Sequence, residues 1–153
     1  MIGPEKTNEN IEKKKGKKTM YRMFICHSSH EKLLVEGIVP RLEKQGIECW
    51  VSSLDVHPGK NFLEEVIPAI NECDCFLVLL SDAACTSGWV EKEVMWAISK
   101  GKYIIPLLVG KMELSEKFAF MLQTAQMCQI GDDVETMTDK IIDLLSKCAC
   151  TDV

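Results

Sequence analysis

Short apolar runs alternate with longer segments of helical periodicity along most of the chain. Each short run has the length and side-chain types of a strand, and polar or turn-forming residues bound it. The predicted strands cover residues 21–26, 47–51, 76–80, 103–109 and 127–130. Residues 76–80 are apolar throughout, which is typical of a central parallel strand buried on both faces.

The segments between these strands repeat apolar residues every three to four positions, as amphipathic helices do. The predicted helices cover residues 31–45, 89–100, 114–122 and 134–147, and a further helix capped by Asn61 buries Phe62, Val66, Ile67 and Ile70. Gly46 and Gly101 should end the helices that precede them. Pro40 and Pro68 interrupt the pattern, and each should kink its helix or remove a hydrogen bond.

Strands that alternate with helices through short loops predict an α/β fold with a parallel sheet covered on both faces. Right-handed crossovers then favour a flavodoxin-like, doubly wound sandwich with five strands in the order 2-1-3-4-5. Pro106 indicates a bulge or an edge position in the fourth strand. We expect a flexible basic tail over residues 1–20, one domain over 21–148 and a short C-terminal tail over 149–153.

Charge is distributed unevenly along the 153 residues, whose net charge is −5. Residues 1–22 carry seven Lys or Arg and three Glu, whereas the remainder carries eleven positive and twenty negative side chains. An acidic domain argues against a nucleic-acid partner. The lysine run at residues 13–18 could contact phosphate or a membrane surface, but such runs are also typical of solubilising tails.

Hydropathy and cysteine usage indicate a reducing, aqueous compartment. No apolar run approaches the roughly 18 residues of a membrane span, and the first residues lack an apolar signal core, so we expect a cytoplasmic protein without a membrane partner. Several of the eight cysteines lie in apolar runs, so we interpret them as reduced residues of the core. Their spacing does not match a zinc site, so we expect no metal.

Polar segments follow the first three predicted strands. They are His27-Ser28-Ser29, residues 55–60 with the turn Pro58-Gly59, and residues 81–88. Because parallel strands end at the same edge of a sheet, these loops should converge and form a site.

The helix predicted over residues 89–100 carries the most distinctive side chains. Its core-facing stripe is predicted to hold Val90, Val94, Ala97 and Ile98. Trp89, Glu93, Trp96 and Lys100 form the adjacent stripe. Glu93 should lie near the strand ends, where a carboxylate between aromatic rings suits sugar or nucleotide chemistry. Alternatively, Glu93 is a half-exposed helix residue and the tryptophans pack beside the core.

The loop residues also allow structural roles. His27 and Ser28 could bind an anion or a ribose, whereas Ser29 is placed to cap the first helix. Asp55 and Lys60 could form an ion pair, and Gly59 suits a turn because no phosphate-binding glycine motif is present. The serine-hydrolase elbow is absent, and no acidic residue follows the first strand as a phosphoacceptor receiver would require.

Three segments together resemble the Toll/interleukin-receptor (TIR) domain, in order and spacing from about residue 21 to 148. Residues 24–29 (Phe-Ile-Cys-His-Ser-Ser) resemble its first box, and residues 54–60 (Leu-Asp-Val-His-Pro-Gly-Lys) resemble its second. Residues 87–93 (Ser-Gly-Trp-Val-Glu-Lys-Glu) resemble the third-helix motif. The sequences of these segments are similar to those of bacterial TIR domains. Two positions differ: Ser52 stands where many bacterial members carry aspartate, and His27 stands where an aromatic residue is common.

The resemblance implies cleavage of NAD⁺ at the nicotinamide–ribose bond, with NAD⁺ as substrate and no cofactor. It implies that Glu93 is the catalytic residue. The expected substrate-binding residues are His27, Ser28, Ser29, Asp55, Lys60, Trp89 and Trp96. It also implies self-association, with the loop Val56, His57, Pro58 and Gly59 of one copy completing the site of another.

Three functions follow as hypotheses. The first is an NAD⁺ nucleosidase that yields ADP-ribose or a cyclic signalling derivative, in bacterial antiphage defence and with a sensor or effector partner. The second is a non-enzymatic TIR interaction module, in which changing Glu93 leaves function intact but changing Pro58 or Gly59 abolishes it. The third is a nucleotide sensor without turnover. The intact tryptophan–glutamate motif favours the enzyme.

Overall fold

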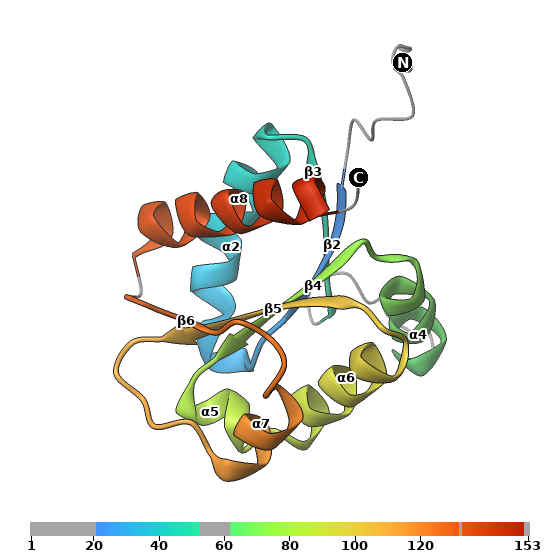
Figure 1. The fold of residues 1–153 in the computed structure, drawn as a ribbon, viewed down its shortest axis with the longest axis vertical. Coiled ribbons are helices and arrows are strands. Elements are labelled where there is room, and N and C mark those ends of the chain that lie inside the picture. Colours follow the sequence, from blue (N-terminus) through green and yellow to red (C-terminus); the bar gives the residue numbers. More distant parts are fainter. Residues whose placement is uncertain (1–20, 53–61, 132, 152–153) are drawn as a thin grey trace.

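Five parallel strands form a single sheet in the computed structural model, which describes residues 21–52, 62–131 and 133–151. The strands are β2 (Tyr21–Cys26), β3 (Ile47–Val51), β4 (Cys75–Leu80), β5 (Tyr103–Val109) and β6 (Cys128–Ile130). Their spatial order is β3-β2-β4-β5-β6 (Figure 1), so the predicted order 2-1-3-4-5 is confirmed.

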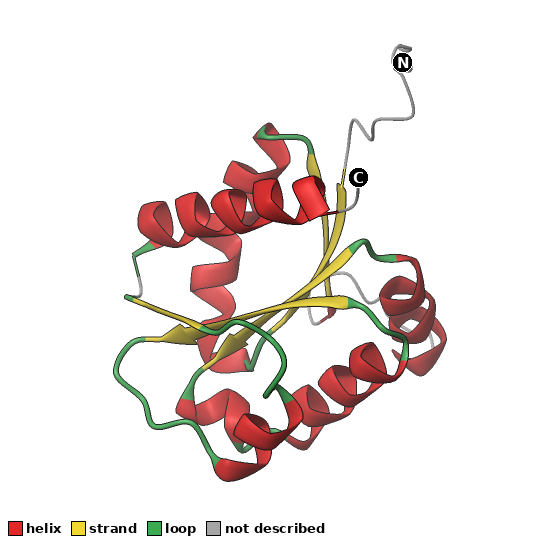
Figure 2. Ribbon diagram, viewed as in Figure 1, coloured by secondary structure: helices red, strands yellow, loops and turns green. Residues whose placement is uncertain are grey.

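Helices cover both faces of this sheet, as Figures 1 and 2 show. The helices are η1 (Ser29–Glu31), α2 (Lys32–Lys44), α4 (Phe62–Glu72), α5 (Asp82–Cys85), α6 (Gly88–Ser99), α7 (Glu116–Met121) and α8 (Val134–Thr151). Helices α2 and α8 lie on one face, and α4, α5, α6 and α7 lie on the other. The doubly wound prediction is therefore confirmed.

Two apolar cores result, one on each face of the sheet. All six residues of β4 are buried, as predicted for a central strand, and they alternate between the two cores. On the α4 and α6 side, the ring of Phe24 stacks on Trp50 and on Phe76, with 5.2 Å between centroids in each pair. These rings fill the space between the sheet and the helices that form the candidate site.

Strand register brings three strand ends to one edge. Ile25 pairs with Val51, and Cys26 pairs with Val78. The residues that follow β2, β3 and β4 therefore leave the sheet at its carboxyl edge, as the sequence predicted.

The prolines interrupt their helices less than expected. Pro40 lies inside α2 and Pro68 inside α4, and both helices continue past them. Both rings are exposed, so the carbonyl that loses its partner can reach water. Packing of Ile38 and Leu42 on either side of Pro40 stabilises the helix despite the missing hydrogen bond.

Pro106 lies in neither a bulge nor an edge strand. The β4–β5 register is one-to-one, with Val78 opposite Pro106, and β5 has a neighbour on each side. β6 pairs only with residues from Leu107 onward, so Pro106 stands just before that ladder begins. A proline is compatible with such a position because fewer ladder hydrogen bonds are required there.

The predicted burial of two residues, Ile67 and Ile98, is wrong. Ile98 is 40% exposed and Ile67 is 37% exposed, although neighbouring positions on the same helices are buried. The apolar stripe of each helix is wider than the surface that the sheet covers, so residues at its margin remain at the surface.

Within the described segments, no helix is long and apolar enough to cross a lipid bilayer.

Candidate active site

Glu93 lies on α6 in the second turn, close to the carboxyl edge of the sheet. Two short caps set the direction of the chain between β4 and α6: Ser81 accepts from the N–H of Ala84 at 3.0 Å, and Ser87 accepts from the N–H of Val90 at 3.2 Å. Glu93 is only 2% exposed. The alternative of a half-exposed helix glutamate is therefore wrong.

The surroundings of this carboxylate are unusual for a charged group. Burial raises the pKa of Glu93 to about 7, and the nearby side chains of Cys26, Ser52 and Trp89 lower it only in part. Cys26, Ser52 and Trp89 lie near the carboxylate, but no described side chain makes a hydrogen bond of normal geometry to either of its oxygens. Buried polar atoms are normally satisfied, so these oxygens are available to a ligand.

The nearest thiol is in the neutral form. Cys26 is the last residue of β2 and is fully buried, and burial together with the charge of Glu93 raises the pKa of its thiol well above the usual value. A thiol in this state is a poor nucleophile. The candidate chemistry therefore belongs to Glu93 rather than to Cys26.

Glu93 borders a cavity of about 160 Å³ between α4 and α6. Its lining consists of Leu63, Val66, Ile67 and Ile70 from α4 and Trp89, Lys92, Glu93 and Trp96 from α6. Its lining, mostly apolar with a few polar groups, is typical of a small-molecule site, whereas its volume among the described residues is smaller than the roughly 300 Å³ at which such sites usually begin. A larger cavity of about 470 Å³ lies at the amino end of β5, but no carboxylate lines it.

Trp96 forms one wall of the Glu93 cavity and is held by a hydrogen bond to α4. Its indole Nε1 donates to Asn71 Oδ1 at 2.9 Å. The ammonium of Lys100, which does not line the cavity, lies 4.7 Å from the ring centroid. Trp89 has a similar neighbour, because Lys92 Nζ lies 5.8 Å from its ring centroid.

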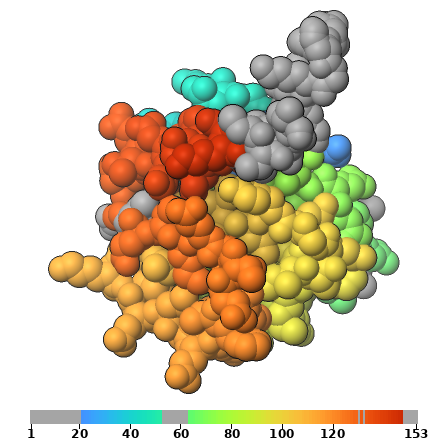
Figure 3. Space-filling model, in the orientation of Figure 1, coloured from blue at the N-terminus to red at the C-terminus, as the bar shows by residue number. Residues whose placement is uncertain are grey.

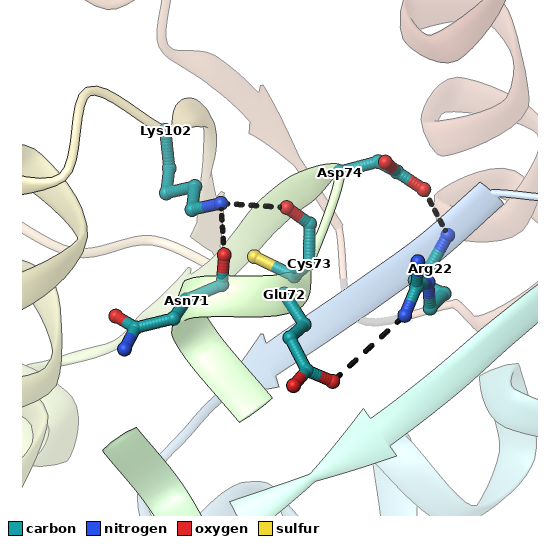
Figure 4. Close-up of polar contacts among 6 residues, drawn as sticks. All are labelled: Arg22, Asn71, Glu72, Cys73, Asp74 and Lys102. Atoms are coloured by element: carbon teal, nitrogen blue, oxygen red, sulfur yellow. Dashed lines mark hydrogen bonds and ion pairs between the residues drawn. The ribbon is translucent and has the colours of Figure 1, made fainter. Parts of the chain in front are cut away.

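The end of α4 is tied to the surrounding elements, which fixes the other wall. Figure 4 shows Lys102 reaching from the loop after α6 to the carbonyl oxygens of Asn71 and Cys73, at 2.6 and 3.0 Å. The N–H of Arg22 in β2 donates to Asp74 Oδ2 at 2.8 Å. Asn71 therefore connects α4 to α6 through its side chain and to the loop after α6 through its backbone carbonyl.

The loops after β2 and β4 meet at one carboxylate. Ser28 Oγ donates to Glu31 Oε1 at 2.5 Å, and Ser81 Oγ donates to the same oxygen at 2.8 Å. The predicted convergence of these two loops is therefore confirmed. The prediction that Ser29 caps the first helix is wrong: Ser28 caps the short helix η1, with its Oγ accepting from the N–H of His30 at 3.2 Å, and α2 begins after Glu31 without a side-chain cap. Ser29 itself is exposed.

His27 lies beneath this loop and is buried. Burial lowers the pKa of its imidazole, although its Nδ1 donates to the carbonyl of Ser28 at 2.6 Å. A neutral imidazole at this position is consistent with a role in shaping the loop.

The predicted site residues fall into three groups. Glu93, Trp89 and Trp96 line one cavity. His27, Ser28 and Ser29 lie at the same sheet edge but do not line that cavity, and their contact with a substrate stays a prediction. The third group lies outside the described residues and comprises Asp55, Val56, His57, Pro58, Gly59 and Lys60.

Sequence reasoning missed three neighbours of Glu93. Lys92 could have been found from helical spacing, since it lies three residues after Trp89. Cys26 ends β2 and Ser52 follows β3 at the sheet edge, but which polar neighbours reach Glu93 depends on how α6 packs.

Residues 23–144 match the family model described as "TIR domain". This chain belongs to the TIR-domain family. Human Toll-like receptor 1 is 28% identical over 78 residues, which is 50% of this chain. That alignment spans 10% of the receptor, so the TIR chain corresponds to only a small part of this curated relative.

Two solved structures share the fold. The Clostridium botulinum CMP N-glycosidase BcmB is 26% identical with a TM-score of 0.58, covering 78% of this chain and 97% of that one. The RPS4 and RRS1 TIR domain heterodimer is 13% identical with a TM-score of 0.62, covering 84% of this chain and 96% of that one. The second similarity concerns the fold alone.

Proposed function

We propose that this TIR domain is an NAD⁺ nucleosidase in which Glu93 is the catalytic carboxylate. The observation that carries the proposal is the burial of Glu93 in the wall of a cavity that two tryptophans also line, with neither oxygen in a hydrogen bond of normal geometry to a described residue. A carboxyl group with a raised pKa that borders a cavity is a candidate for a functional site.

One carboxylate is sufficient for this reaction. Most glycosidases need a second carboxyl group to protonate the leaving group. The nicotinamide of NAD⁺ is already cationic and leaves as a neutral base. Water then adds to the ribose carbon, so NAD⁺ and water give nicotinamide, ADP-ribose and a proton.

Glu93 would act on the sugar rather than on the leaving group. As the glycosidic bond breaks, positive charge develops on the ribose ring, and a carboxylate in a cavity of low polarity stabilises it strongly. The same oxygens can accept hydrogen bonds from ribose hydroxyls. Only the ionised form of Glu93 stabilises the positive charge, and its fraction rises as pH rises through about 7.

The tryptophans suit a substrate with flat rings. Trp89 and Trp96 lie one on each side of Glu93 along α6, and both line the cavity. Aromatic faces favour stacking with nicotinamide or adenine. We expect one indole to hold the nicotinamide ring while the carboxylate approaches the ribose.

A nucleoside monophosphate is the second candidate substrate. The CMP N-glycosidase matches over nearly its whole length, and its name describes cleavage of an N-glycosidic bond. The cytosine of CMP is uncharged and would leave as an anion, so its departure requires protonation. The protonated form of Glu93, which is well populated near pH 7, could supply it.

The biological setting that we propose is bacterial antiphage defence in the cytoplasm, triggered by self-assembly or by a sensor partner. Consumption of NAD⁺ stops the metabolism of an infected cell, and a requirement for assembly would keep the activity low beforehand.

The test is nicotinamide release from NAD⁺ by concentrated protein, followed by chromatography, with CMP in a parallel reaction. The native chain is compared with Glu93→Gln, which keeps the shape of the side chain but cannot ionise. Glu91→Gln is the matched control, because Glu91 lies on the same helix but pairs with Lys117 at 2.9 Å outside the cavity.

Release by the native chain and by Glu91→Gln, with at least a hundredfold loss in Glu93→Gln, would support the proposal. Equal release by all three would show that Glu93 is not the catalytic residue. No release from either substrate by folded, assembled protein would favour the interaction module.

A further inference from the structure

The Glu93 cavity carries one positive charge, supplied by Lys92. Of the eight described side chains that line it, six are uncharged, and the remaining two are Glu93 and Lys92. A carboxylate in the wall and an ammonium at the mouth give the cavity two poles of opposite sign.

Lys92 is held at this mouth by Trp89. Its Nζ lies 5.8 Å from the centroid of the Trp89 ring, which is within the range of a cation–π contact. The spacing of three residues on α6 places the two side chains on neighbouring parts of the helix surface. The ammonium is thus oriented before any ligand arrives, while its exposed position leaves it accessible.

Neighbouring lysines are already engaged within the fold. Lys117 pairs with Glu91 at 2.9 Å, and Lys102 donates to two backbone carbonyls at the end of α4. Among the described residues, no carboxylate lies within ion-pair distance of Lys92. Its charge is therefore available to an anionic ligand.

We infer that Lys92 binds the 5′-phosphate of the substrate ribose and makes the cavity selective for nucleotides over nucleosides. This inference rests on the proposed function and names the substrate class of the same site. NAD⁺ and CMP share a phosphate on the 5′-carbon of the ribose whose glycosidic bond would break. A ribose held at Glu93 would therefore direct this phosphate toward a nearby cation.

The test compares Lys92→Met with Lys100→Met. Both variants remove a lysine that lies over a tryptophan of α6, but Lys100 does not line the cavity. Steady-state kinetics with NAD⁺ and with nicotinamide riboside, which has no phosphate, separate the charge effect from a packing effect. Lys92→Arg tests rescue by a second cation.

For Lys92→Met we expect KM for NAD⁺ to rise about tenfold with little change in kcat, as the loss of one charged contact predicts. Nicotinamide riboside should be unaffected, and Lys100→Met should resemble the native chain. An equal rise in KM for both substrates, or the same effect in Lys100→Met, would overturn the inference.

Binding measured without turnover separates this inference from the proposed function. Calorimetry with ADP-ribose and with adenosine should show that the native chain prefers ADP-ribose and that Lys92→Met loses this preference. Such binding without nicotinamide release would leave the Lys92 inference standing and reject the nucleosidase. Equal affinity of the native and Lys92→Met proteins for ADP-ribose, or no binding by either, would reject the role of Lys92.

Discussion

Burial and charge conflict most strongly at Glu93. The residue lies in a cavity wall with 2% of its surface exposed, and burial raises its pKa from 4.5 to about 7. The ionised form of Glu93 destabilises the folded chain unless a bound ligand compensates for the lost hydration of the carboxylate. Such strain at one side chain is typical of sites at which function opposes stability.

The first prediction concerns stability and pH. The folded state binds the Glu93 proton more tightly than the unfolded state, so its stabilising effect is complete below about pH 4.5 and is lost as pH rises to about 7. The loss amounts to about 3 kcal/mol. Glu93→Gln should therefore exceed the native chain in stability by up to about 3 kcal/mol at pH 8 and show little difference near pH 4.5.

Urea unfolding at both pH values measures this difference. Glu91→Gln serves as control and should change the free energy of unfolding by less than about 1 kcal/mol, because it removes a surface ion pair. An identical effect of Glu93→Gln at both pH values would show that the carboxylate is not buried in solution.

At the scale of elements, local signals determine where α6 begins and ends. Ser87 caps its first turn, and Gly101 follows its last residues with a φ of +67°. The sequence predicted the stop at Gly101 because glycine adopts this left-handed conformation without a steric penalty. The outward faces were harder to predict, as the exposure of Ile98 shows.

The second prediction compares two glycines, one at each end of α6. Gly101→Ala should destabilise the fold by about 1 kcal/mol, because its φ is positive although nothing surrounds the added methyl group. Gly88→Ala should instead stabilise it by about 0.5 kcal/mol, since Gly88 is helical and has the same open surroundings. Thermal unfolding of both variants shows whether each substitution stabilises or destabilises the fold. Destabilisation by both would contradict this account of the helix ends.

The α6 helix also contacts α7 on the surface seen in Figure 3, where the yellow and orange segments adjoin. The ion pair between Lys117 and Glu91 joins these helices. Phe120 remains 72% exposed on α7 and Met95 52% exposed on α6. Large exposed apolar side chains are common at protein contacts, although single ones are normal on any surface.

For the whole molecule, we propose that assembly controls activity. The second-box loop at residues 55–60 lies outside the described residues, and the family resemblance assigns it to completing a neighbouring site. The RPS4 and RRS1 TIR domains, which share this fold, form a heterodimer.

The third prediction follows from that proposal. Nicotinamide release per mole of protein should increase with protein concentration, in parallel with the particle mass measured by light scattering. Gly59→Pro should abolish both increases, because it changes the loop sequence and leaves the Glu93 side chain in the protein. Constant specific activity from a monomer would contradict control by assembly.

The sequence alone determined the order of strands and helices and the type of sheet. Periodicity is a local property, and right-handed crossovers leave few arrangements for alternating strands and helices. Three motifs in order also identified the family. Each of these conclusions depends on neighbours within a few residues or on rules that hold for any chain.

Only the tertiary structure decided how buried Glu93 is and which groups surround it. Cys26, Ser52 and Asn71 come from three other segments, and the packing of α6 against α4 and the sheet brings them near Glu93 or Trp96. It also decided that Lys92 lines the cavity whereas Lys100 does not. Solvent exposure and pKa depend on distances between residues remote in sequence, and periodicity carries no information about those distances.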